Sequence, residues 1–258
     1  MAESTYALIT GASSGIGECF ARALAARKHN LVLVARSKDK LEALAEELRA
    51  KHGVQAVVFD ADLSVPGAAA ALAEKLAAGK LSVDLLVNNA GFGARGEFWN
   101  LPLERFDEML QLNVLALVEL THSLLPAMIA NKSGGVINVS STASFQPVPY
   151  TTVYGATKAF VTSFSMAIAE ELRPHGVKVV TLCPGGTKTN FFVAGDYKKR
   201  TLPGGLQAPE EVVEEALRAL DRSGGLVIPR FLNKLSIFSQ RLTPRSTVAR
   251  ITARLFRP

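Results

Sequence analysis

The segment LITGASSGIG, residues 8–17, ends one apolar run and opens an amphipathic stretch. Its three glycines permit a tight turn and let backbone N–H groups approach a pyrophosphate at the N-terminus of a helix. The spacing is GxxxGxG and not the GxGxxG of the usual dinucleotide motif, so an ordinary glycine-rich loop between a strand and a helix also fits it. If a dinucleotide binds here, we expect it to contact Gly11, Ser13, Ser14, Gly15, Ile16 and Gly17.

Short apolar runs alternate with amphipathic stretches along the rest of the chain. The runs are β-branched or leucine-rich and are bounded by Gly, Asp, Asn or Pro, which predicts buried strands at 6–10, 31–35, 56–59, 84–89, 135–140, 177–183 and 225–229. Helices are predicted at 15–28, 38–51, 66–79, 103–131, 152–173 and 209–222. This alternation predicts an α/β fold with a single Rossmann-type, doubly wound parallel sheet of about seven strands. We expect residues 1–229 to form one nucleotide-binding catalytic domain and residues 230–258 to form a C-terminal amphipathic helical extension.

The end of the second predicted strand bears on the choice of dinucleotide. A carboxylate there would accept a hydrogen bond from the ribose 2′-hydroxyl of NAD, but the sequence LVLVARSKDK offers Arg36, with two lysines close behind. A cation at this position suits a 2′-phosphate, so we predict NADP(H) as the cofactor, although Arg36 could instead begin a solvated helix. After the third strand, Asp62 and Leu63 are expected beside the adenine, although Asp62 could simply end a strand.

Four polar residues further along suggest a reaction site. Tyr154 and Lys158 are spaced four apart at the start of a predicted helix, so their side chains project from the same face. Ser141 ends the fifth predicted strand, and Asn113 stands among apolar neighbours in the helix before that strand. A neighbouring ammonium favours the ionised form of a tyrosine, so the pair suits proton transfer. Taken singly, the residues also fit an exposed helical pair, a strand cap and a satisfied core amide.

In this order and spacing, the motifs resemble those of the short-chain dehydrogenase/reductase superfamily. The matching segments are TGASSGIG (10–17), NNAG (88–91), Asn113, Ser141, YGATK (154–158) and PGGTKT (184–189). Ser141 stands thirteen residues before Tyr154, the interval usual in the superfamily, and the resemblance runs from residue 5 to about 229 and extends to a bacterial branch of broad carbonyl reductases. It implies further cofactor contacts at Asn89, Ala90, Gly91, Tyr154, Lys158, Pro184, Gly185, Thr187 and Thr189.

The resemblance also implies a role for each catalytic residue. Tyr154 would exchange a proton with the carbonyl oxygen as hydride moves between nicotinamide and substrate. Lys158 would lower the pKa of Tyr154 and hydrogen-bond the nicotinamide ribose. The Ser141 hydroxyl would stabilise the developing alkoxide, and Asn113 would bind a water that links Lys158 to solvent. The implied activity is the NADP(H)-dependent interconversion of a carbonyl and an alcohol by a homodimer or homotetramer.

The expected substrate is a small lipophilic ketone or aldehyde, or the corresponding alcohol. The predicted pocket walls are apolar or aromatic, although the aromatic residues could equally belong to the core: Phe92, Phe145, Val148, Tyr150, Phe191, Phe192 and Tyr197. Arg95 and the basic run 198–200 could instead meet a phosphopantetheine, so reduction of a 3-oxoacyl thioester stays open. The extended branch of the superfamily, which acts on nucleotide sugars, is disfavoured by the glycine spacing and the chain length.

The composition is that of an ordinary globular protein. Of its 258 residues, 48% are hydrophobic and 20% are charged. Cys19 and Cys183 match no CxxC or zinc spacing and the four histidines match no metal spacing, so we expect neither a disulfide framework nor a metal site. The N-terminus has no signal-peptide pattern, and we expect no apolar run of membrane-spanning length. These features predict a cytoplasmic protein.

Residues 230–258 hold seven basic side chains and no acidic one. The remaining chain has 22 basic and 23 acidic residues, so the high pI does not indicate nucleic-acid binding. Two apolar stripes run opposite the cations: Phe231, Leu235, Phe238 and Leu242, then Val248, Ile251 and Leu255. The stripes could lie on an anionic membrane surface or, as we prefer, pack on the domain or a partner subunit. A membrane-associated NADP(H)-binding scaffold without turnover is the alternative function, but it would not need Ser141, Tyr154 and Lys158.

Overall fold

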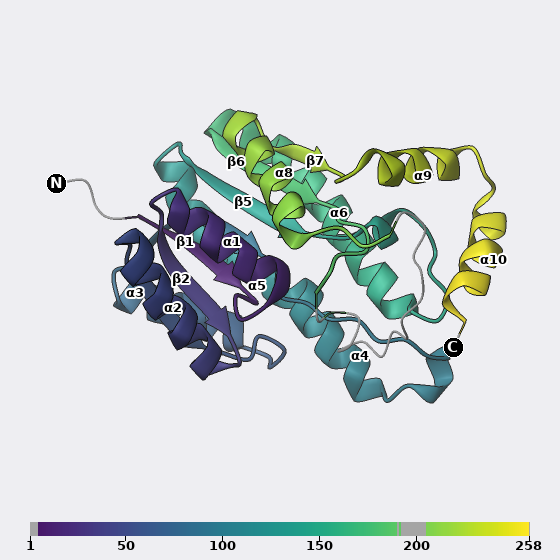
Figure 1. The fold of residues 1–258 in the computed structure, drawn as a ribbon, viewed down its shortest axis with the longest axis horizontal. Helices are drawn as coiled ribbons and strands as arrows, with labels where there is room; N and C mark the ends of the chain where they lie inside the picture. Colours follow the sequence, from purple (N-terminus) through teal and green to yellow (C-terminus); the bar gives the residue numbers. More distant parts are fainter. Residues whose placement is uncertain (1–4, 190, 192–204, 258) are drawn as a thin grey trace.

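A computed structural model of the protein describes residues 5–189, 191 and 205–257 (Figure 1). Its strands are β1 (Thr5–Thr10), β2 (Asn30–Ala35), β3 (Ala56–Asp60), β4 (Ser82–Asn88), β5 (Gly134–Val139), β6 (Val177–Leu182) and β7 (Gly225–Val227). They form one sheet in the order β3-β2-β1-β4-β5-β6-β7, and every neighbouring pair is parallel. The predicted doubly wound α/β fold is therefore confirmed. The strand order reverses between β1 and β4, and folds of this kind bind ligands at the carboxyl ends of the strands beside such a reversal.

The connecting segments are helical. The helices are α1 (Gly15–Ala26), α2 (Lys38–His52), α3 (Ala68–Ala78), α4 (Leu103–Leu110), α5 (Ala116–Ala130), α6 (Thr152–Leu172), α8 (Pro209–Arg222), α9 (Phe231–Arg241) and α10 (Arg245–Phe256). A π-helical turn, η2 (Gln111–Leu115), joins α4 to α5, and short 3₁₀ turns occur at η1 (Phe98–Asn100), η3 (Thr142–Phe145) and η4 (Arg173–His175). Each helix predicted from the sequence is present within about two residues of its expected bounds, a margin normal for helix ends.

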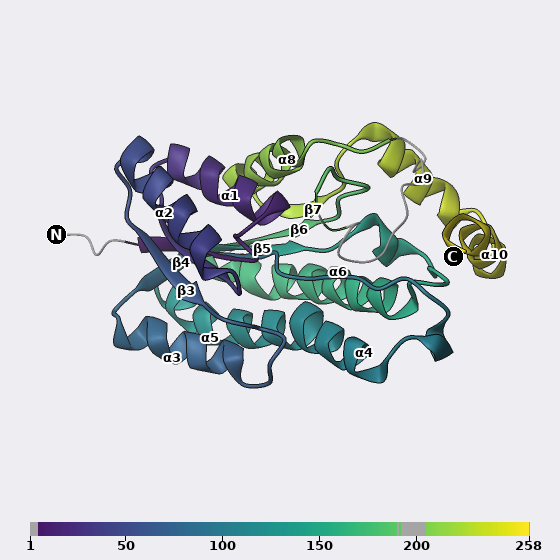
Figure 2. The same ribbon diagram turned by 60° about the horizontal axis from the view of Figure 1, so that its bottom comes forward.

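Two layers of helices sandwich the sheet (Figure 2). Helices α1, α2 and α8 cover one face, and α3, α4, α5 and α6 cover the other. Alternate residues of each strand face the two layers: in β1, Ala7 and Ile9 join the core under α1, whereas Leu8 joins the core on the other face. Because the central strands are buried on both faces, their sequences are continuously apolar. The result is a rigid platform for the loops at the strand ends.

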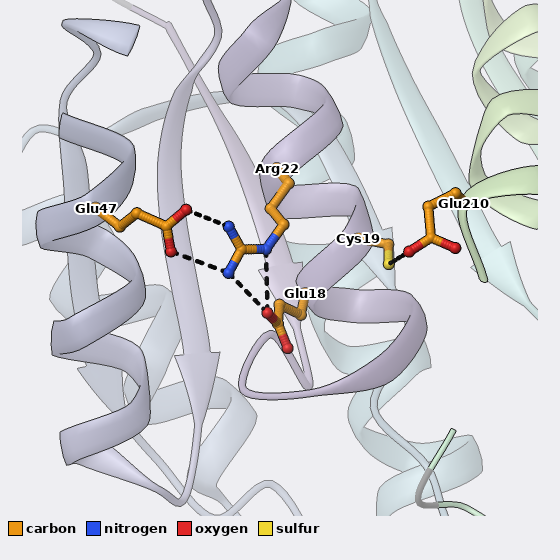
Figure 3. A network of polar contacts seen from close by, with 5 residues as sticks. All are labelled: Glu18, Cys19, Arg22, Glu47 and Glu210. Atoms are coloured by element: carbon orange, nitrogen blue, oxygen red, sulfur yellow. Dashed lines mark hydrogen bonds and ion pairs between the residues drawn. The ribbon is translucent and has the colours of Figure 1, made fainter. Parts of the chain in front are cut away.

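Side chains tie α1 to the two helices beside it (Figure 3). Arg22 donates to Glu18 one turn back, with Nε 3.1 Å from Oε1, and its Nη2 lies 3.0 Å from Oε2 of Glu47 on α2. Towards α8, Cys19 Sγ lies 3.6 Å from Oε1 of Glu210. Partly exposed contacts of this kind contribute only about 0–1 kcal/mol each. Their effect is to fix the orientation of α1, whose N-terminus follows the glycine turn.

The run α4–η2–α5 forms one helical segment, Leu103–Ala130, that is 28 residues long and has a mean hydropathy of 1.5 in its most apolar window. By length and composition it could cross a membrane, so the expectation that no segment reaches that length was wrong. Scattered charged and polar residues interrupt the apolar run in the sequence and hide it. In the described structure Phe106, Leu117 and Leu120 are buried and α5 packs against β4 and β5, as expected of a helix that covers the sheet.

Helices α9 and α10 form an arm at the end of the molecule where the strands terminate (Figure 1). Within the two helices, the buried residues are Ile237, Val248 and Thr252. The predicted apolar stripes otherwise remain at the surface; Phe231 is 74% exposed and Leu242 is 77% exposed. The arm therefore contacts the domain, while most of its apolar side chains face outward in the single chain.

Candidate active site

A cavity of about 540 Å³ lies at the carboxyl ends of the strands. It is lined by the glycine turn after β1, by residues that follow the other central strands and by the start of α6. The predicted site residues that line it are Gly11, Ser13, Ser14, Gly15, Ile16, Arg36, Asp62, Leu63, Asn89, Ala90, Gly91, Ser141, Tyr154, Lys158, Pro184, Gly185, Thr187 and Thr189. Residues that are far apart in the sequence thus line one cavity.

The turn between β1 and α1 fits the diphosphate of a dinucleotide. Gly15 has a φ of +59°, a conformation that favours glycine, and the side chain of the N-cap residue Ser14 makes no capping hydrogen bond to α1. The first N–H groups of an α-helix have no partners within the helix, so an anion bound beside this turn would receive their hydrogen bonds.

Gly17 is a predicted cofactor residue that lies behind the turn and does not line the cavity. A Cβ at this position would be 2.3 Å from the carbonyl oxygen of Gly11 and 2.5 Å from Nδ2 of Asn89. Asn89 Nδ2 donates to the Thr10 carbonyl at 2.9 Å, and Thr10 Oγ1 accepts from the backbone N–H groups of Asn89 and Ala90, both at 3.0 Å. Gly17 therefore lets α1, the turn and the end of β4 pack together.

Asn113 also lies behind the cavity, in the π-helical turn η2. Its buried amide accepts from the Phe92 N–H at 3.1 Å and donates to the Phe92 carbonyl at 3.0 Å and to Thr157 Oγ1 at 3.1 Å. A Cβ on Gly91 would be 2.9 Å from Asn113 Oδ1 and 3.4 Å from Lys158 Nζ, so the amide and the ammonium border the same narrow space. Asn113 thus joins the segment after β4 to α6. Its water-binding role stays a prediction.

Basic side chains border the cavity beyond β2. Arg36 and Lys40 both line it, and Arg36 Nη1 lies 3.6 Å from Asp62 Oδ2. Asp62 also accepts from the N–H and the hydroxyl of Ser64, at 3.0 and 2.6 Å. Burial acts to raise the pKa of Asp62, but the Ser64 hydrogen bonds and the charge of Arg36 outweigh it, so the pKa is lowered. Two cations without a carboxylate at the end of β2 itself fit a phosphate on the adenine ribose.

Ser141 and Tyr154 bring two hydroxyl groups to the cavity. Ser141 precedes η3, and its Oγ accepts from the Ala143 N–H at 3.1 Å. The Ser141 hydroxyl is close enough to Tyr154 to act on its pKa, which it lowers. The Tyr154 ring packs against Phe191, with 5.3 Å between the ring centroids. A carbonyl oxygen bound in the cavity could therefore meet both hydroxyl groups at once.

Lys158 lies beneath this pair and is only 5% exposed. Its Nζ donates to the Val139 carbonyl at 2.8 Å and is 5.9 Å from the centroid of the Tyr154 ring. Burial lowers the pKa of Lys158 to about 8. Burial also raises the pKa of Tyr154 to about 12, against the lowering effect of the hydrogen bond with Ser141. In the protein alone the pKa of Tyr154 is therefore raised and not lowered as the resemblance implies, because burial outweighs the effect of Ser141.

Neither cysteine has the properties of a nucleophile. Cys183, beside the site, is fully buried, and its Sγ lies 3.7 Å from Thr162 Oγ1. Burial raises the pKa of Cys183. Burial, followed by the charge of Glu210, raises the pKa of Cys19 to about 12. Both thiols therefore stay protonated at neutral pH and are unreactive.

Three of the predicted apolar walls, Phe92, Val148 and Phe191, line the cavity. Phe145 and Tyr150 do not, so their assignment as walls was wrong. The Tyr150 hydroxyl instead accepts a hydrogen bond from an arginine of the C-terminal extension. Two other predicted walls, Phe192 and Tyr197, lie outside the described residues.

The sequence also missed part of the lining. The additional residues are Val34, Ala35, Ser37, Lys40, Ala61, Leu112, Val139, Ser140, Thr142, Ala143, Gln146, Thr151, Gly186 and Phe256. Most of them stand next to predicted residues in the sequence, so proximity to a motif would have found them. Phe256 belongs to the last helix of the chain, and no motif marks it.

Comparisons with known proteins agree with this geometry. A family model described as short chain dehydrogenase matches residues 5–198. The very-long-chain 3-oxoacyl-CoA reductase of Pyrenophora tritici-repentis is 34% identical in an alignment of 227 positions that covers 86% of this chain and 64% of that protein. The chain thus spans less than two thirds of the length of this curated relative.

Solved structures are similar to this protein over a larger share of its chain. A short-chain dehydrogenase from Sphingobium yanoikuyae in complex with NADPH has a TM-score of 0.82 and 35% identity, covering 92% of this chain and 94% of that one. A structure that concerns 7beta-hydroxysteroid dehydrogenase stereoselectivity has a TM-score of 0.85 and 30% identity, covering 96% of each chain. Because the family model matches well over half of the sequence, the chain belongs to the short chain dehydrogenase family.

Proposed function

We propose that the protein is an NADP(H)-dependent oxidoreductase that interconverts a carbonyl and an alcohol by hydride transfer. The supporting observation is the grouping of Ser141, Tyr154 and Lys158 in one cavity with the glycine turn. Two hydroxyl groups and a buried ammonium line the same cavity, which is an arrangement suited to moving a proton to or from a substrate oxygen.

The residues then act as follows in reduction. When bound, the nicotinamide supplies the hydride, and in oxidation it accepts one. Tyr154, which holds its proton at neutral pH, gives that proton to the carbonyl oxygen as negative charge develops there. The Ser141 hydroxyl donates a hydrogen bond to the same oxygen and stabilises the charge. Lys158, which is positively charged below about pH 8, stabilises the tyrosinate that remains.

Asn113 is a positioning residue in this scheme. Its amide holds the backbone of Phe92 and the hydroxyl of Thr157, which lies on the same helix as Tyr154 and Lys158. Loss of this amide would let the segment after β4 move relative to α6. The predicted proton path through a water near Asn113 is part of the same proposal.

For the cofactor we propose NADP(H). Arg36 and Lys40 line the cavity at the end of β2, where a carboxylate would favour NAD instead. The structural relative from Sphingobium yanoikuyae, which was solved with NADPH, supports this choice. The glycine turn would hold the diphosphate, and Asp62 and Leu63 would lie beside the adenine.

For the substrate we propose a lipophilic ketone or aldehyde, or its alcohol. The apolar walls Phe92, Val148 and Phe191 favour an uncharged molecule. A relative whose structure concerns a 7beta-hydroxysteroid dehydrogenase fits a bulky lipophilic substrate. The second candidate is a 3-oxoacyl thioester, because curated relatives are named very-long-chain 3-oxoacyl-CoA reductase.

The test is NADPH consumption with a panel of ketones, aldehydes and 3-oxoacyl thioesters. Tyr154→Phe should lower kcat by about 10²-fold or more, because the proton donor is lost. NADPH affinity, measured by titration of the cofactor fluorescence, should change little. The matched control is Tyr6→Phe, at the other end of β1. It removes a hydroxyl group that donates a hydrogen bond to Gln55, and it should leave turnover unchanged.

The panel also separates the alternatives. Turnover of thioesters with no turnover of the free ketones would favour the second candidate. Tight NADPH binding by the wild type without turnover of any member of the panel would favour a non-catalytic scaffold. Equal turnover by Tyr154→Phe and the wild type would exclude Tyr154 as the proton donor.

The homodimer or homotetramer and the cytoplasmic location remain predictions. Leu110, Phe160 and Met166, on α4 and α6, are between 43% and 48% exposed, which agrees with a subunit contact on that face. Size-exclusion chromatography with light scattering should give at least twice the 27.5 kDa mass of the chain, and a monomer at micromolar concentration would contradict the prediction.

Peripheral membrane contact through residues 230–258 is a separate proposal. The exposed apolar side chains of α9 and the surrounding cations support it, since together they suit an anionic lipid surface. Sedimentation with anionic vesicles should decrease in the double variant Arg250→Glu/Arg254→Glu. Sedimentation equal to that of the wild type would remove the membrane proposal.

A further inference from the structure

The last helix of the chain contributes directly to the cavity. Phe256, the final residue of α10, lines it together with Phe92, Val148 and Phe191. The Phe256 side chain is half-buried, whereas the neighbouring Leu255 is 46% exposed. Four apolar side chains from four separate segments therefore line the described cavity.

An arginine from the loop after β4 holds the end of α10. Arg95 Nε donates to the Phe256 carbonyl at 2.9 Å, and Arg95 Nη2 donates to the Arg257 carbonyl. The last carbonyl groups of a helix have no partners within the helix, and that end of the helix dipole attracts a cation. Arg95 satisfies both needs. It is therefore committed to the helix end, although the sequence left it open as a contact for an anionic substrate.

Two more hydrogen bonds attach α10 to the loop that carries Val148. Thr252 Oγ1 shares its single proton between the Val248 carbonyl of its own helix, at 2.7 Å, and the Pro147 carbonyl, at 3.0 Å, and Arg257 Nε lies 3.3 Å from the Tyr150 hydroxyl. Pro147 and Tyr150 flank Val148 in the sequence, so the loop and the helix end are fixed to each other. The Tyr150 backbone has a φ of +65°, a strained conformation for a tyrosine that persists only when surrounding contacts hold it.

We infer that Phe256 is a specificity-determining residue that selects carbonyl substrates with a large apolar substituent. This inference rests on the proposed function and names the substrate class of the same site. The Phe256 ring contacts the apolar substituent and removes it from water, while a small ketone offers little apolar area for such a contact. Arg95 is a positioning residue for Phe256, because it acts through the backbone of the helix end.

The test compares a phenyl-alkyl ketone with butanone in the presence of NADPH. Phe256→Ala should lower kcat/KM for the phenyl-alkyl ketone about tenfold, mainly through KM, because apolar contact area with the substrate is lost. The value for butanone should change less than about twofold. Phe256→Leu keeps part of the apolar contact and should give an intermediate loss, which also provides a result if the alanine variant folds poorly.

Variants of Arg95 test the positioning role. Arg95→Gln should lower the ratio of kcat/KM between the two ketones in the same direction as Phe256→Ala. Arg95→Lys should recover part of that ratio, because it keeps a cation at the helix end. The matched control is Arg254→Gln, which removes an exposed cation of α10 that does not line the cavity and should leave the ratio unchanged.

The outcomes separate this inference from the proposed function. If Phe256→Ala and Phe256→Leu turn over both ketones with the wild-type ratio, the inference about Phe256 is wrong and the proposed function stands. A changed ratio for Phe256→Ala with an unchanged ratio for Arg95→Gln would overturn the role of Arg95 alone. If the wild type binds NADPH and reduces no carbonyl, the proposed function itself fails.

Discussion

Replacing Lys158 with methionine should change how the stability of the protein depends on pH. Burial lowers the pKa of Lys158 from 10.5 to about 8, although its Nζ donates to the Val139 carbonyl at 2.8 Å. In the unfolded chain the same ammonium is surrounded by water. A charged Lys158 is therefore less favourable in the folded protein than in the unfolded chain, and it lowers the free energy of unfolding.

The two pKa values define the pH window. Between about pH 8 and pH 10.5 the unfolded chain holds a proton on this lysine that the folded protein has released, so stability rises with pH across that range. Below about pH 8 the lysine is protonated in both states, and the cost reaches a constant value of about 3 kcal/mol. From pH 7 to pH 9 the wild type should gain about 1 kcal/mol that Lys158→Met cannot gain.

Urea unfolding followed by circular dichroism at pH 7 and pH 9 measures this gain. The relevant quantity is the difference in unfolding free energy between wild type and variant, because the other titrating groups contribute to both proteins. Lys75→Met is the matched control, since it removes an exposed lysine of α3, and its difference from wild type should stay constant. A change of less than about 0.4 kcal/mol for Lys158→Met, which is within the usual error of additivity, would refute the burial argument.

Two further substitutions test the cofactor end of the cavity. Arg36→Asp should lower the NADPH-to-NADH ratio of kcat/KM at least about tenfold, because a carboxylate replaces the cation beside the 2′-phosphate. An unchanged ratio would exclude Arg36 from recognition of that phosphate. Gly17→Ala should lower the unfolding free energy by about 2 kcal/mol and weaken NADPH binding, because its Cβ would stand 2.3 Å from the Gly11 carbonyl oxygen. Thermal melts and a fluorescence titration measure both effects, and an unchanged melting temperature would contradict the close-packing argument.

Short-range patterns predicted the framework because they depend on neighbours within one element. On α2, three leucines recur at helical spacing and are buried on the side that faces the core: Leu41, Leu44 and Leu48. The catalytic candidates also follow from local position. Ser141 follows the end of β5 by two residues and Tyr154 lies in the first turn of α6, and the parallel strands of such a sheet all present their carboxyl ends at one edge.

Features that depend on distant residues could not be predicted. The four-residue spacing places an ammonium near Tyr154, but the burial that raises the pKa of Tyr154 depends on the whole surrounding fold. Likewise, the hydrogen bond from Arg95 to the Phe256 carbonyl joins residues 161 positions apart, and neither residue belongs to a motif. The alternation of apolar and basic residues in α10 predicted a helix with an apolar face, but it did not indicate that the helix end reaches the cavity.

The opposite pKa shifts of Tyr154 and Lys158 have a common cause and suit the proposed reaction. Before the proton moves, the cation is unfavourable, because its positive charge is buried without an opposite charge on the tyrosine. After Tyr154 has given up its proton, the tyrosinate supplies that charge. The fixed ammonium is therefore matched to the state in which the proton has left, as expected of a site that stabilises a transition state more than the ground state. By this reasoning the buried charge of Lys158 has two effects at pH 7: it lowers the stability of the folded protein, and it favours proton donation by Tyr154. Lys158→Met should therefore be more stable than the wild type and inactive.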